Sequence, residues 1–210
     1  MSEYGYIPEA PEQSFGNNKG IFTPKDIYDL TRADKYTNYG QLELIETQTF
    51  SSSVTQIDFT DIKQDIYNVH FLTHSNLYTP SGNYKVGYRF FESGVLETGS
   101  VYQYATQQVD TNGGNSEVRT TSADYIRIQN TSVQNFKVSG YTYFYNLGDN
   151  TKYSFATFHS YGLGNSDLTF TGFGSAVLPQ SSTVDGIRIF KSSGNIDDFK
   201  VSLYGIKEYS

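Results

Sequence analysis

The three histidines, His70, His74 and His159, are the first side chains to consider for metal binding or acid–base chemistry. His70 and His74 lie four residues apart, a spacing that places two ligands on one face of a helix. Around them, however, apolar and polar residues alternate, which predicts a strand. On a strand, residues four apart stand roughly 13 Å from each other, too far to share one ion. We therefore predict no metal site and expect all three histidines to be surface or half-buried strand residues.

Two groups of acidic residues could support other chemistry. Asp58, Asp61 and Asp65 are close in sequence, and glycosidases use paired carboxylates, but aspartates in a turn more often bond to their own local backbone. The run Asp110–Glu117 starts like a calcium loop, yet Gly114 and Asn115 break that pattern at its fifth and sixth positions. We interpret this run as a long exposed loop. The sequence thus predicts no catalytic residue, no metal, no cofactor and no enzyme.

One feature does indicate binding. Tyr141, Tyr143 and Tyr145 alternate along one strand and would form an aromatic ridge that stacks on sugars or receives a protein partner. The favoured alternative is that these tyrosines face the core of the fold, because alternating aromatic residues usually point inward. Asn112 and Asn115 of the predicted loop are further candidates for contact with a ligand.

Composition narrows the classes of function. The 210 residues carry a net charge of −7, which argues against sequence-independent binding to nucleic acid. There is no cysteine, and 16% of the residues are aromatic, with 19 Tyr and 15 Phe. No apolar run reaches the roughly 20 residues that a membrane-spanning helix needs, and the first residues lack the pattern of a signal peptide. We therefore expect no membrane insertion and synthesis in a cytoplasm.

The elements that would position these side chains are mostly strands. Thr23 followed by Pro24 and Asp26 is a helix-start pattern, and it predicts one short helix over about 24–33. After residue 40, nine to eleven short strands alternate with turns, and we expect the strands at 67–78 and 84–91 to form a hairpin. This pattern predicts an all-β, antiparallel β-sandwich.

The N-terminal stretch differs from the rest. Its first 22 residues show no period but carry more large apolar side chains than a solvated tail would. We interpret residues 1–39 as an anchoring arm with the short helix, and residues 40–210 as the sandwich domain. The alternative for the arm is a frayed terminus. The residues expected to anchor it are Tyr4, Tyr6, Ile7, Phe15, Ile21 and Phe22.

Three segments of this chain resemble virion structural proteins of tailed bacteriophages, notably those of marine and cyanobacterial phages. They are GIFTPKDIYDL (Gly20–Leu30), IDFTDIKQDIYNVHF (Ile57–Phe71) and FKVSLYGIK (Phe199–Lys207). The chain departs from many of these proteins at residues 61–63, where they carry Ile-Pro, and it lacks their tryptophan after the first helix.

The resemblance implies a fold and a function. The fold is a jelly-roll-like sandwich preceded by an extended arm and a helix. The function is a non-enzymatic virion component, such as a capsid decoration, a head fibre or a tail fibre. Its partners would be other capsid or tail proteins and further copies of itself, as in a trimer. The alternative is a carbohydrate- or receptor-binding module at the tip of a phage appendage, with a host-surface glycan as ligand.

Overall fold

The computed structural model describes residues 13–14, 17–18, 23–33, 42–79, 85–129, 136–163, 168–197 and 199–207. The chain divides into two compact units, Met1–Gly40 and Gln41–Ser210. Among the described residues, no helix has the length and apolar character needed to cross a membrane.

The first unit contains two short paired strands and the only helix among the described residues. β1 (Gln13–Ser14) pairs with β2 (Asn17–Asn18), and α1 spans Pro24–Arg32, close to the predicted helix. The Asp26 amide donates to Thr23 Oγ1 at 3.2 Å, and the Thr23 amide donates to Asp26 Oδ2 at 2.8 Å. This reciprocal capping box is the one that the sequence predicts, and it satisfies two amides at the helix start.

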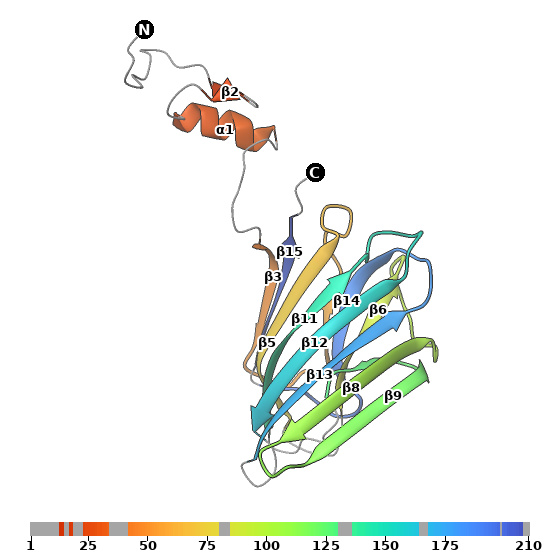
Figure 1. Ribbon diagram of the computed structural model, residues 1–210. Coiled ribbons are helices and arrows are strands. Elements are labelled where there is room, and N and C mark those ends of the chain that lie inside the picture. Colours follow the sequence, from red (N-terminus) through yellow and green to blue (C-terminus); the bar gives the residue numbers. More distant parts are fainter. Residues whose placement is uncertain are drawn as a thin grey trace. The chain divides into compact units, whose positions relative to one another are not determined.

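The second unit is a sandwich of two antiparallel sheets (Figure 1). The large sheet has eight strands in the order β3 (Leu42–Phe50), β15 (Phe199–Ile206), β5 (Val69–Thr79), β11 (Phe136–Tyr145), β12 (Ser154–Leu163), β13 (Thr169–Leu178), β8 (Tyr102–Asp110) and β9 (Asn115–Ala123). The small sheet has the order β10 (Ile126–Arg127), β6 (Val86–Glu92), β14 (Val184–Lys191) and β4 (Gln56–Phe59), and β7 (Val95–Leu96) pairs with β6.

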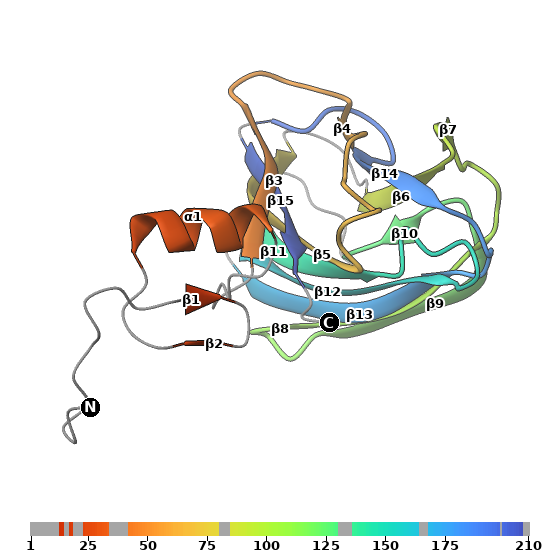
Figure 2. The same cartoon turned by 90° about the horizontal axis from the view of Figure 1, so that it is seen from above.

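This architecture confirms the predicted all-β sandwich, whereas its assignment as jelly-roll-like stays a prediction. Seen from above, the large sheet curves around the small sheet, so one of its faces is covered and the other is convex (Figure 2). The described part of the sandwich contains two strands that the sequence analysis did not predict, β7 and β9.

The core lies between the two sheets and contains several of the aromatic residues. Tyr88, Phe90 and Phe144 are fully buried, and their rings meet edge to face with centroids 5.3 and 5.8 Å apart. The Tyr88 hydroxyl lies 2.9 Å from Thr142 Oγ1, so the one polar atom of this ring has a partner inside the core.

The predicted hairpin between strands 67–78 and 84–91 is wrong. β5 pairs with β11 and β15 in the large sheet, whereas β6 pairs with β14 in the small sheet. Both strands bury one apolar face, and a sandwich covers such faces by placing successive strands in opposite sheets. Turn residues between two strands do not distinguish a hairpin from a crossing between sheets.

Two segments that lie far apart in the sequence are neighbours in space. β5 pairs antiparallel with β15, from Val69 opposite Ile206 to Ser75 opposite Lys200. Just before β5, the Tyr67 ring lies against Gly205, where an added Cβ would be 2.3 Å from the ring. The Tyr67 hydroxyl donates to Glu43 Oε2 at 2.5 Å. Burial, helped by this bond and the Glu43 charge, raises the pKa of Tyr67 to about 12, so the hydroxyl stays protonated.

Candidate functional site

Two of the three histidines lie in the core, so the prediction that they are surface or half-buried is wrong for them. His70 and His74 are buried because their strand, β5, directs both side chains toward the small sheet. His70 Nε2 lies 2.7 Å from the Ile62 carbonyl oxygen. Burial lowers the pKa of both, that of His74 to about 4. His159 is half-buried on β12, as predicted. The described residues contain no group of three His, Asp or Glu side chains that could hold a metal ion.

The three aspartates near residue 60 do not form an acidic cluster. Asp61 and Asp65 lie in the connection between β4 and β5, as predicted, and Asp61 pairs with Lys63 at 2.7 Å. Asp58, predicted to form the turn, instead lies on β4. There it accepts two bonds from Arg188 of β14, at 2.7 and 2.6 Å. Asp58 therefore joins two strands and has no catalytic arrangement with the other two aspartates.

The predicted long loop at Asp110–Glu117 is also wrong, because a tight turn joins β8 to β9 here. Asp110 Oδ1 accepts from the amides of Asn112 and Gly114 at 2.9 and 2.8 Å, and Gly113 has φ +80°. The aspartate thus closes the turn on its own backbone. Asn115 already belongs to β9, an edge strand whose polar composition is typical of a loop.

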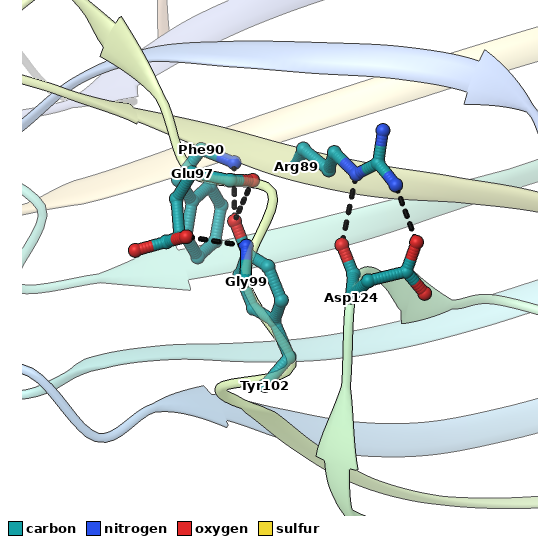
Figure 3. Close-up of polar contacts among 6 residues, drawn as sticks. All are labelled: Arg89, Phe90, Glu97, Gly99, Tyr102 and Asp124. Carbon is teal, nitrogen blue, oxygen red and sulfur yellow. Dashed lines mark hydrogen bonds and ion pairs between the residues drawn. The ribbon is translucent and has the colours of Figure 1, made fainter.

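A pair of carboxylates that the sequence analysis missed lies beside β7. Burial raises the pKa of Glu92, whereas the Gly99 amide, donating at 2.6 Å, lowers that of Glu97. Opposite shifts of this kind occur in acid–base pairs. Here, however, Ser182 donates to Glu92, and Figure 3 shows Glu97 bonded to the connection before β8.

The neighbouring contacts in Figure 3 are structural as well. The Tyr102 hydroxyl accepts from the Phe90 amide at 2.9 Å and donates to the Glu97 carbonyl at 3.3 Å. Arg89 donates to the Asp124 carbonyl and carboxylate at 2.8 and 2.5 Å. These bonds attach β6 to the segments before β8 and β10, so the carboxylate pair belongs to a network that holds loops in place.

The convex face of the large sheet is the surface most suited to binding, and we call it the outward face. Strand register arranges its side chains in three rows that cross seven strands, from β3 to β8. The first row consists of Leu42, Ile206, Val69, Tyr145, Phe155, Val177 and Gln103. The second consists of Leu44, Tyr204, Phe71, Tyr143, Thr157, Ser175 and Ala105. The third consists of Thr47, Ser202, Thr73, Tyr141, His159, Phe173 and Gln107.

The three predicted tyrosines lie on this face, so the favoured interpretation that they form the core is wrong. Their strand buries Val138, Thr142 and Phe144 instead, and Tyr141 is 38% exposed. Ring contacts link Tyr141 to Tyr143 at 5.9 Å and Tyr143 to Tyr145 at 6.4 Å between centroids. The same chain of contacts continues to Phe71, Tyr204, His159 and Tyr161. The ridge is therefore wider than the sequence analysis predicted.

A trough of about 650 Å³ lies on the outward face toward β8. Short side chains of the second row, Thr157, Ser175 and Ala105, lie along it. Tyr145 and Phe155 are among its larger lining residues, and Phe155 is 44% exposed. The outward face thus combines protruding rings with a hollow.

The other predicted contact residues do not join this surface. Asn112 and Asn115 lie at the β8–β9 turn, at the sheet edge away from the tyrosines. The six residues expected to anchor the arm lie outside the described residues. Three further exposed rings on β12 and β13 were not predicted from the sequence: Phe155, Tyr161 and Phe173.

Comparison of the chain with models of protein families, with curated proteins and with solved structures finds no match. No relative therefore assigns a role to any residue of the outward face.

Proposed function

We propose that the protein is a non-enzymatic structural component of a tailed-phage virion, attached to the capsid or tail as a decoration or fibre. It would be made in the host cytoplasm and act in the virion. Its partners would be other virion proteins and further copies of itself, as in a trimer. Its action would involve no cofactor, no nucleic acid and no membrane insertion.

The observation that carries this proposal is the meeting of two segments on which the resemblance to virion proteins rests. One segment contains β4 and the start of β5, and the other is β15, more than 120 residues later in the chain. β5 of the first pairs with β15 of the second in the large sheet, and Tyr67 of the first packs on Gly205 of the second. A side chain at Gly205 would displace the Tyr67 ring, so the position of this ring depends on a glycine at 205. The two segments thus form one structural unit, as parts of one motif would.

The division into two units suits attachment and display. In the proposed mechanism, the aromatic residues of the arm bury against a neighbouring virion protein, and the sandwich projects from the particle. Burial of apolar surface would supply the binding free energy, about 25 cal/mol per Å². The sandwich has its own core, so its folding would not depend on the arm.

Deletion of residues 1–36 tests this mechanism. We expect the shortened chain to keep the β-sheet circular dichroism spectrum of the full chain and to be absent from particles assembled in its presence. Quantitative mass spectrometry of purified particles measures the incorporation. A shortened chain that folds and still incorporates at full occupancy would show that the arm is not the anchor.

A second candidate function is sugar or receptor binding at the tip of an appendage. It is favoured by the exposure of Tyr141 beside His159, with ring centroids 5.6 Å apart, because exposed rings can stack on sugars. A glycan array with the purified full chain tests this function. Binding of a defined saccharide that is lost in Tyr141→Ala would support it, whereas a structural component shows no saccharide preference.

A further inference from the structure

The outward face is unusual in its charge. The three rows between β3 and β8 contain no Asp, Glu, Lys or Arg, although the whole chain has 37 such residues. Arg119 and Glu117 of β9 continue the second and third rows only at the far edge. The charge-free area therefore spans nearly the whole width of the sheet.

The size of this area matches that of a protein interface. Neighbouring strands lie about 4.8 Å apart, and each residue advances about 3.3 Å along a strand. Seven strands and three rows thus give a footprint of roughly 34 by 20 Å, on the order of 700 Å². A standard interface buries about 800 Å² on each partner, and crystal contacts of weak specificity bury less.

The kind of partner follows from the apolar character. Transient interfaces are only about as apolar as the remaining protein surface, whereas the interfaces of permanent homo-oligomers are more apolar. Most permanent assemblies of soluble proteins are symmetric homo-oligomers. A charge-free face also suits contact with a copy of itself, because no charge meets a like charge across the interface. The absence of like-charge contacts favours self-association of a chain whose net charge is −7.

The shape of the outward face, with protruding rings and a trough, also favours self-association. Phe155 and Phe173 protrude, with 44% and 49% exposure. Phe155 borders the trough, which has the short side chains of Thr157, Ser175 and Ala105 along it and is also lined by Arg119 of the edge strand β9. A ring of one copy can enter the trough of the next. Because the sheet is convex, its two flanks point in different directions (Figure 2), and each flank can meet a different neighbour in a closed ring.

We propose that the outward face is the self-association surface of this chain and is covered by further copies of it. The proposal extends the homo-oligomer of the proposed function and names its interface. It is tested on the purified chain without particles, so it can fail while the virion assignment holds, or hold while that assignment fails.

The test is the mass of the full-length chain in solution, measured by light scattering after size-exclusion chromatography at micromolar concentration. We expect a multiple of the 23.6 kDa chain mass for the natural chain. Phe155→Glu and Phe173→Glu each place a charge in the proposed interface and should shift the mass to that of one chain. Phe155→Leu keeps the site apolar and should keep the oligomer. Val95→Glu is the matched control, because Val95 is 71% exposed but belongs to the small sheet.

Circular dichroism should show that each charged variant remains folded, since both side chains point away from the core. A natural chain with the mass of one copy would overturn the proposal. The proposal would also fail if both Glu variants stayed oligomeric, or if Val95→Glu dissociated the oligomer equally. A monomeric chain whose saccharide binding is lost in Phe155→Glu would assign the outward face to sugars instead.

Discussion

Each sheet of the sandwich has one face that points away from the core, and the two faces differ in their charged side chains. On the small sheet, Asp58, Arg188 and Arg89 form one row across β4, β14 and β6. The two guanidinium groups lie over the rings of Phe91 and Phe190, at 5.3 and 4.6 Å from the centroids. On the large sheet, no guanidinium or ammonium group of the described residues lies over the rings of the outward face, and the three rows contain no charged side chain.

Because of this difference, the two faces are suited to different contacts. A guanidinium over a ring keeps the ring compatible with water, because the charged group stays hydrated while its plane covers the apolar surface. The small sheet therefore presents a face suited to solvent. The large sheet presents exposed rings in a charge-free area, which is typical of a surface that binds a partner.

The largest difference in stability should be found between variants on the covered face of the large sheet and variants on its outward face. Phe144→Ala removes a fully buried ring and should lower the free energy of unfolding by about 3–5 kcal/mol. Phe155→Ala, on the neighbouring strand, should change it by less than about 1 kcal/mol in a dissociated chain. Urea denaturation of both variants in the Phe173→Glu background gives these values. Equal losses would mean that Phe155 belongs to the core of a single chain.

The second effect is a pH dependence that arises on the covered face. Burial lowers the pKa of His74 from its ordinary value of 6.5 to about 4. The unfolded chain therefore binds a proton between these two pH values that the folded chain does not bind, so protonation favours unfolding. The free energy of unfolding should have its full value above pH 6.5 and should fall by on the order of 3 kcal/mol as the pH drops toward 4.

Urea denaturation at several pH values measures this loss. His74→Leu should flatten the dependence, and the part that remains should come from His70, whose pKa burial also lowers. An unchanged pH dependence in His74→Leu would show that His74 is not the group responsible.

A third effect tests the unit that supports the virion proposal. Gly205→Ala places a Cβ 2.3 Å from the Tyr67 ring and should cost about 1–3 kcal/mol of stability. In a Tyr67→Ala background the same change should cost much less, because the ring that it would displace is gone. A double-mutant cycle by urea denaturation measures this coupling. Additive effects would mean that the two residues do not depend on each other.

The smallest effect concerns the charged face of the small sheet. Asp58→Asn removes the charge that receives two bonds from Arg188 in a half-buried pair and should cost about 1 kcal/mol, less at high salt. Asp61→Asn is the control, because its pair with Lys63 is exposed, and it should cause no measurable change. Thermal denaturation at low and high salt compares the two. Equal effects of the two variants would contradict the assigned role of Arg188 and Asp58.

Sequence patterns predicted the class of fold well and the pairing of strands less well. Alternation revealed most strands, and Thr23 with Asp26 revealed the helix start, because both signals are local. The placement of β5 and β6 in different sheets depends on contacts between distant segments, which turn residues do not encode. β9 was missed because an edge strand without a buried face has the polar composition of a loop.

The candidate site shows where alternation ceases to be informative. Along β11, Tyr141, Tyr143 and Tyr145 alternate with Thr142 and Phe144, so both faces carry large side chains. A pattern of this kind is typical of strands that are covered on both sides. It does not reveal which face meets the core of the same chain. His70 and His74 were misplaced for the related reason that polarity alone suggested solvent, whereas register placed them inside.

The most direct measurement is hydroxyl-radical footprinting of the natural full-length chain at the concentration at which it associates. Phe155, Tyr161 and Phe173 should be protected relative to the dissociated Phe173→Glu variant, with the substituted position itself left out of that comparison. Val95 and Phe91, on the small sheet, should be modified equally in both. This result would show that the charge-free face is covered by protein. Equal modification of Phe155 and Tyr161 in the two samples would show that the face meets water, and would contradict the proposed difference between the two faces.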